Sequence, residues 1–200
     1  MTRHLKRCSP DHDLPQGRDA RLFRLRVEDA YSPLFWLDLE MKAGATLDDL
    51  DDFLRGIWLE CCGHLSSFDI EGVSYTVSTY GGPFDDDRSM DVELAEVLAD
   101  GTRFGHTYDF GTSTELKLRV VGEREGRIGR EPLRVLSHNE APEWACMVCD
   151  RPAAEICTYC IYERENPFLC DAHAEEHDCE EEALLPVVNS PRMGMCGYTG

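Results

Sequence analysis

Hydrophobic and polar residues alternate along two neighbouring segments near the start of the chain. Every second residue is apolar in Phe23–Val27, and the same period of two continues through Phe35–Met41. Such alternation is typical of strands that bury one face. The Ser32-Pro33 turn between the segments predicts a β-hairpin, with Asp38 and Glu40 on its polar face.

The hydrophobic period then changes to that of an amphipathic helix. Thr46 is a good N-cap, and Asp49 three residues later resembles the partner of a capping box. Apolar residues recur at helical spacing at Leu47, Leu50, Phe53, Leu54 and Ile57. The same spacing predicts an outward-facing set that consists of Asp48, Asp51, Asp52 and Arg55.

Shorter patterns complete the order ββαββαββ, which predicts an α+β fold with a small mixed sheet packed on one main helix. The remaining elements are expected around Leu65–Ile70, Val73–Thr79, Val92–Ala99, Phe104–Phe110 and Glu115–Val121, with a further edge strand compatible with Leu133–Leu136.

Charge and composition narrow the classes of partner. The chain has 200 residues and a formal net charge of −19, so its surface repels phosphate backbones and anionic lipid. No apolar run approaches the roughly 18 residues that cross a bilayer, and residues 1–20 lack the apolar core of a signal peptide. We therefore expect a cytoplasmic protein without a membrane partner, whose thiols are reduced rather than paired as disulfides.

Cysteine and histidine residues gather near the end of the chain. Seven of the ten cysteines lie between residues 146 and 196. Two CxxC pairs are followed by a CxxH pair and by a histidine and a cysteine two residues apart. These eight candidate ligands are Cys146, Cys149, Cys157, Cys160, Cys170, His173, His177 and Cys179. Zinc binds four such ligands in a tetrahedron, so the set predicts two structural zinc ions.

We expect the pairs to alternate between the two ions, because sequential pairing would leave two small beads with little shared core. The first and third pairs would then hold one zinc, and the second and fourth pairs the other. The spacing resembles cross-braced B-box, MYND and HIT-type fingers, without matching any of them residue for residue. The alternative at the last position is Cys196 in place of Cys179, since residues two apart on a helix diverge.

The predicted domains follow from these patterns. Residues 1–20 are expected to be a flexible lead-in, 21–137 the α+β domain, 142–182 the zinc-binding module, and 183–200 a tail that packs on the domain. A segment of this size with few aliphatic residues needs metal to fold.

Other reactive residues have simpler interpretations. The adjacent Cys61 and Cys62 cannot easily share one tetrahedral ion, so buried apolar thiols are expected there. A hydrolytic cluster of His64, His106 and Asp109 is conceivable, although a structural role for His106 on its strand is favoured.

Several segments resemble a prokaryotic family named after an uncharacterised open reading frame, the third, of an Ri plasmid, also described as an insertion-element passenger protein. The matching pieces cover about residues 20–135 and are Phe23–Met41, Thr46–Trp58, His64–Tyr75 and Thr107–Thr114. Two family motifs fit at His64, Leu65, Tyr108, Asp109, Phe110 and Gly111, whereas Thr112 and Thr114 replace the usual aspartate and tryptophan. The resemblance implies an α+β domain and no established activity.

The favoured hypothesis is a non-catalytic zinc protein that contacts another protein. The first alternative is an enzyme that uses a groove near His64 and Asp109. The second is a nucleic-acid accessory protein of a mobile element, which the negative charge disfavours.

Overall fold

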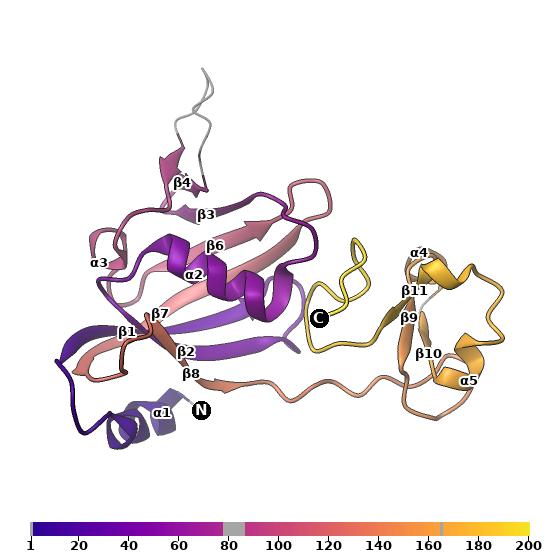
Figure 1. Ribbon diagram of the computed structural model, residues 1–200, viewed down its shortest axis with the longest axis horizontal. Coiled ribbons are helices and arrows are strands. Elements are labelled where there is room, and N and C mark those ends of the chain that lie inside the picture. The colour runs from indigo at the N-terminus through magenta and orange to yellow at the C-terminus, as the bar shows by residue number, and fades with distance from the viewer. Residues whose placement is uncertain (1, 78–86, 165) are drawn as a thin grey trace. The chain divides into compact units, whose positions relative to one another are not determined.

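The computed structural model describes residues 2–77, 87–164 and 166–200 (Figure 1). Contacts divide the chain into two compact units. The sheet unit comprises Met1–Leu54 and Leu65–Asn139, and the cysteine-rich unit comprises Arg55–His64 and Glu140–Gly200. A short segment from the middle of the chain therefore belongs with the C-terminal residues.

The sheet unit has a mixed α+β fold that consists mostly of strands. Its elements are α1 (Thr2–Cys8), η1 (Ser9–His12), β1 (Ala20–Asp29), β2 (Trp36–Lys42), α2 (Leu47–Leu54), β3 (Ser66–Ile70), β4 (Val73–Thr76), β5 (Arg88–Ser89), α3 (Leu94–Val97), β6 (Arg103–Tyr108), β7 (Thr114–Gly126) and β8 (Leu133–His138). The strands form one eight-stranded sheet of order β5-β4-β3-β6-β7-β1-β2-β8. Neighbours pair antiparallel, except β4 and β5, which run parallel.

The first hairpin and the main helix form where their patterns predict them. In the register of β1 and β2, Leu25 lies opposite Leu39, and both side chains are fully buried. The helix α2 runs across one face of the sheet (Figure 1). Its start has a reciprocal cap, because the Thr46 amide donates to Asp49 Oδ2 at 2.9 Å and the Asp49 amide donates to Thr46 Oγ1 at 3.1 Å.

The structure has more elements than the predicted order ββαββαββ. Helix α1 and strand β5 are additional, and β8 forms the edge beside β2. The end of the strand expected at Val73–Thr79 lies outside the described residues from position 78 onward. Within the described ranges, no helix is both long enough and apolar enough to cross a membrane.

The polar face of the first hairpin is buried, which corrects the expectation of an exposed face. Asp38 and Glu40 are each only 1% exposed. Arg26 donates to Asp38 at 3.0 Å, and Glu40 accepts hydrogen bonds from Arg124 and Arg134. Arginine side chains thus compensate the buried carboxylates, as buried charges require.

The predicted flexible lead-in at 1–20 contains α1 and η1, and ion pairs join this segment to the sheet. Asp13 accepts hydrogen bonds from Arg124 Nη2 at 2.7 Å and from Arg134 Nη2 at 3.1 Å. Arg134 also donates to the carbonyl oxygens of Ser9 and His12. The same two arginines therefore hold both the sheet carboxylate Glu40 and the N-terminal segment.

The cysteine-rich unit contains η2 (Arg55–Leu59), β9 (Glu155–Cys157), α4 (Cys160–Glu163), β10 (Phe168–Leu169), α5 (Asp171–Ala174), η3 (Glu181–Ala183) and β11 (Leu184–Pro186). Three short antiparallel strands form a sheet of order β10-β9-β11. The tail predicted at 183–200 thus contributes β11 to this unit. Ser190 Oγ donates to the Trp58 carbonyl at 2.6 Å, so the tail also binds the η2 segment.

Candidate metal centres

Each pair of candidate ligands lies at a tight turn next to a short strand or helix. Cys146 and Cys149 belong to a turn closed by the bridge between Ala145 and Pro152, in which the Cys146 amide donates to the Arg151 carbonyl at 2.9 Å. Cys157 ends β9, and Cys160 begins α4.

The second half of the ligand set follows β10. Cys170 directly precedes α5, and His173 lies within that helix. The His177 amide donates to the Ala174 carbonyl at 3.3 Å just after α5, and Cys179 lies beyond it. Cys179 is therefore past the helix end, where residues two apart can turn toward the same point.

The first group consists of Cys146, Cys149, Cys170 and His173. His173 Nδ1 lies 3.3 Å from the Cys146 sulfur, 3.5 Å from that of Cys149 and 3.4 Å from that of Cys170. The sulfurs of Cys149 and Cys170 are 3.9 Å apart. One imidazole nitrogen can donate or accept only one good hydrogen bond, so hydrogen bonding does not account for three sulfur neighbours.

A tetrahedral zinc ion does account for them. With Zn–S bonds of about 2.3 Å and Zn–N bonds of about 2.0–2.1 Å, the tetrahedron has S···S edges of about 3.8 Å and S···N edges of about 3.5 Å. The four distances given above for the first group, 3.3 to 3.9 Å, match these lengths within a few tenths of an ångström. The group therefore has the size and donor set of a Cys3His zinc site.

The second group consists of Cys157, Cys160, His177 and Cys179. Its four ligand atoms lie within 4.8 Å of one another, and the Cys160 sulfur is 3.5 Å from His177 Nε2. Along the chain the two groups alternate, pair by pair. This is the interleaved grouping that the sequence predicts, with Cys179 rather than Cys196 at the last position.

Hydrogen bonds lower the pKa of thiols in both groups, most of all at Cys146 and Cys157. Burial raises the pKa of the Cys146 thiol, but backbone N–H groups around it, including Val148, outweigh burial and lower that pKa to about 6. Burial likewise raises the pKa of Cys157, and hydrogen bonds from the Cys160 amide and from His177 lower it to about 7.

In the second group, the pKa values of the other two thiols shift upward. Burial and the nearby Cys157 raise the pKa of Cys160 to about 12, and burial and Cys157 also raise the pKa of Cys179. Negative charge on one sulfur therefore opposes ionisation of the next. A divalent cation among the sulfurs reverses this opposition, because a coordinated thiol is deprotonated outright.

A third group of four was not predicted as a site. Cys61, Cys62, His64 and Cys196 also bring their ligand atoms within 4.8 Å of one another, all inside the cysteine-rich unit. The expectation of buried apolar thiols at Cys61 and Cys62 is wrong, since Cys61 is partly exposed and Cys62 is exposed. The sequence feature that could have indicated this group is the spacing of Cys62 and His64, two residues apart. It did not indicate the fourth member, because Cys196 lies far along the chain.

The residues of the conceivable hydrolytic cluster have separate surroundings. His106 is buried in the sheet unit, where its Nε2 lies 2.6 Å from Asp51. Asp109 has a left-handed backbone with φ of 64° and accepts hydrogen bonds from the amides of Gly111 and Thr112, as a turn residue does. His64 belongs to the third cysteine group of the other unit.

Comparison with known proteins gives a fold but no function. No family model matches the chain, and no curated protein matches it significantly. Among solved structures, the chain is similar to the crystal structure of a protein of unknown function from Methanosarcina mazei Go1. The TM-score is 0.51 at 17% identity, over 59% of this chain and 69% of that chain. At this identity the likeness shows the mixed α+β fold alone.

Proposed function

We propose that the protein is a non-catalytic zinc-binding protein, in which two structural zinc ions shape the cysteine-rich unit for contact with another protein. The observation that carries the proposal is the pair of interleaved Cys3His groups, each of which supplies four protein ligands. Structural zinc sites are four-coordinate in this way, whereas catalytic zinc keeps one position for water or substrate.

The small core of the unit supports a structural role for the metal. The cluster of buried residues around the second group is Cys157, Cys160, Leu169 and Ala183. Two of these four are themselves candidate ligands, so few aliphatic side chains pack around this group. Metal binding at structural zinc sites contributes about 10–16 kcal/mol at neutral pH, which is enough to fold such a unit.

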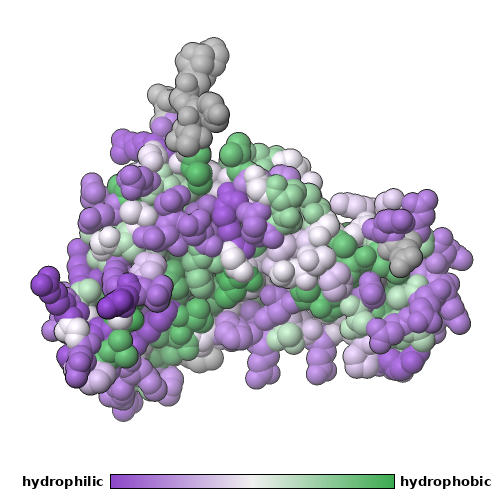
Figure 2. Space-filling view, viewed as in Figure 1, coloured by the Kyte–Doolittle hydropathy of each residue, from purple (hydrophilic) through white to green (hydrophobic). Residues whose placement is uncertain are grey.

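The surface of the unit favours a protein partner with basic and apolar side chains. Tyr159 and Tyr162 are 56% and 83% exposed, and they lie one turn apart at α4. A groove beside the second group is lined by three carboxylates, those of Glu155, Asp171 and Glu175. The visible surface of the unit is mostly hydrophilic with scattered hydrophobic residues (Figure 2). Exposed tyrosines are frequent anchors in protein interfaces.

A site-specific crosslinker tests the partner. A photoreactive phenylalanine analogue replaces Tyr162 in the native cell, and the matched control places it at Tyr31, which is 78% exposed in the sheet unit. We expect a discrete protein adduct at position 162 that is absent at 31. Its yield in a cell lysate should fall as salt is added, because the groove is acidic. Mass spectrometry identifies the adduct.

Two results would contradict the proposal. An adduct pattern at position 162 that equals the pattern at 31 would remove the evidence for a docking surface near α4. Nucleic acid in the adduct would favour the accessory-protein alternative instead.

A further inference from the structure

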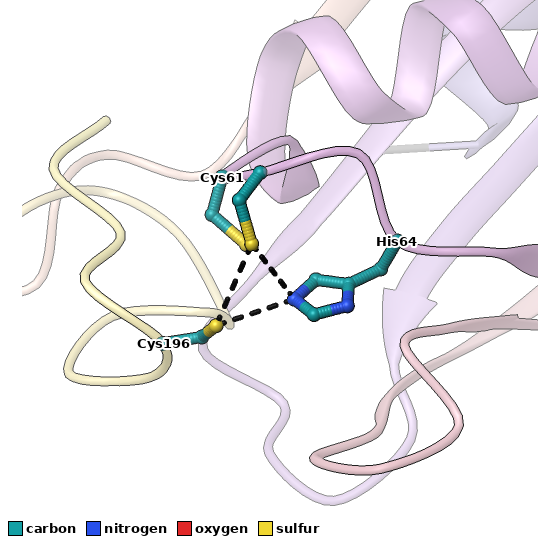
Figure 3. A group of neighbouring side chains, drawn as sticks. Cys61, His64 and Cys196 are labelled. Atoms are coloured by element: carbon teal, nitrogen blue, oxygen red, sulfur yellow. Dashed lines mark hydrogen bonds between the residues drawn. The ribbon is translucent and has the colours of Figure 1, made fainter.

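The third group joins two segments of the cysteine-rich unit that lie far apart in the sequence. Cys61, Cys62 and His64 follow η2, whereas Cys196 lies near the C-terminus. In Figure 3 the side chains of Cys61, His64 and Cys196 point toward one another. His64 Nε2 is 3.0 Å from the Cys62 sulfur and 3.2 Å from that of Cys196. We propose that this group is a third zinc site with three thiolates and one imidazole as ligands.

The distances fit a metal better than hydrogen bonds or a disulfide. The sulfurs of Cys62 and Cys196 are 3.8 Å apart, as are those of Cys61 and Cys62, against about 2.0 Å in a disulfide. These lengths equal the S···S edge of about 3.8 Å in a zinc tetrahedron. The two S···N contacts are a few tenths of an ångström shorter than the ideal edge, and one imidazole nitrogen cannot hydrogen-bond well to both sulfurs.

The backbone of the first segment allows two adjacent cysteines to face one point. The chain leaves η2 with the Glu60 amide bound to the Arg55 carbonyl at 2.9 Å, and it then bends through Cys61 and Cys62. Gly63 has a φ of 80°, a conformation that glycine adopts readily. Arg55 fixes the end of this turn, because its Nη2 donates to the His64 carbonyl at 2.7 Å.

The backbone at Cys196 is strained in a way that a ligand role explains. Its φ of 49° lies in the left-handed region, which non-glycine residues seldom adopt. The positions around it, Gly194 and Gly197, also have positive φ, so the tail curls sharply at this point. Strained residues are concentrated at functional sites, where the surrounding structure holds them in place.

Arg192 supplies a positive charge next to this group. It is fully buried, and its Nη2 lies 3.5 Å from the Cys61 sulfur. The Arg192 amide donates to Ser190 Oγ, which in turn donates to the Trp58 carbonyl. Three thiolates around one Zn²⁺ leave a net charge of −1, which a guanidinium beside one sulfur offsets.

With this assignment nine of the ten cysteines belong to three Cys3His groups, and only Cys8 lies outside them. Cys62 and Cys196 are exposed, whereas Cys146 and Cys170 in the first group and Cys157 and Cys160 in the second are buried. Solvent reaches the third ion most easily, so we expect it to exchange faster than the other two and to leave first when a chelator is added.

Zinc itself is the probe for the test. Native mass spectrometry of the full chain, purified with zinc, should show three ions in the unmodified protein and in Cys8→Ser, and two ions in Cys196→Ser. Cobalt substitution gives a second measurement on a second variant, His64→Asn. Its thiolate-to-cobalt absorption should fall, because one of the three Cys3His sites loses a ligand, while circular dichroism of the protein stays unchanged.

Two results would overturn the third site. One is two ions in the unmodified protein and also in Cys196→Ser, which leaves the two interleaved sites intact. The other is a Cys62–Cys196 disulfide in freshly purified protein, detected as a mass lower by two hydrogens together with two bound ions.

Discussion

Asp51 is buried on α2, where its carboxylate joins two strands of the sheet to the helix. Its side chain is 1% exposed, lies 2.6 Å from His106 Nε2 and accepts a hydrogen bond from Ser66 Oγ at 2.9 Å. His106 Nδ1 has no hydrogen-bond partner among the described residues. The imidazole therefore carries its proton on Nε2 and donates it to the carboxylate.

Replacing Asp51 by alanine should destabilise the sheet unit by about 2–4 kcal/mol, because it leaves the His106 and Ser66 donors buried without this acceptor. Asp52→Ala is the matched control, since Asp52 is the next residue and is exposed. Urea unfolding of both variants gives the difference directly. Equal midpoints would show that the buried contact contributes no net stability.

The buried face of α2 differs from the face that the sequence pattern predicts. Helical spacing places Asp51 with the outward residues, and charged side chains are seldom buried. Its partners Ser66 and His106 come from strands far along the chain, so the compensation is invisible locally. Phe53, expected in the buried stripe, is partly exposed, whereas Leu47, Leu50 and Leu54 are fully buried. Asp51 is thus buried because of tertiary contacts, which the local sequence pattern does not show.

At the same scale, η1 and the turn after it attach to the sheet through charge. Arg124 beside Asp13 lowers the pKa of that carboxyl from 3.8 to about 2. The ionised form is therefore favoured in the folded chain. The stabilisation is fully present above about pH 4, the unfolded value, and is lost as the pH falls through about 2.

Asp13→Asn should accordingly lower the unfolding free energy by about 1 kcal/mol near neutral pH, since partial exposure screens the pair. The difference from the unmodified protein should shrink as the pH falls below about 4. Asp11→Asn is the control, because Asp11 is exposed and its neutralisation changes net charge by the same amount. A constant difference at every pH would mean that Asp13 acts through packing rather than through its charge.

At the scale of the whole molecule, the two units have different sources of stability. The sheet unit buries apolar side chains along β1, β2, β6 and β7 and along α2. The cysteine-rich unit has three short strands and a small core. Ligand spacing was enough to predict which residues gather in the first two groups, because the two members of each pair are close in sequence. The third group was not predicted, since Cys196 lies 134 residues beyond Cys62 and only the fold brings them together.

The segment Arg55–His64 belongs to the cysteine-rich unit, although its sequence pattern continues that of the main helix. The sequence pattern continues helical spacing through Ile57, so Arg55–His64 looks like the end of the main helix. In the structure the helix changes at Arg55 into the π-helix η2. The segment Arg55–His64 contacts the C-terminal tail, because Trp58 accepts a hydrogen bond from Ser190 and Cys61 accepts one from Arg192. Periodicity alone does not show which unit a helix end belongs to.

We propose that zinc supplies the folding free energy of the cysteine-rich unit and not that of the sheet unit. Hydrogen exchange followed by mass spectrometry, with and without a strong chelator, tests it most directly. Without zinc we expect amides of β9, β10 and β11 and of Arg55–His64 to lose protection, while those of β1, β2 and Leu47–Leu54 keep it. Unchanged protection in the three short strands, or simultaneous loss in both units, would contradict the account.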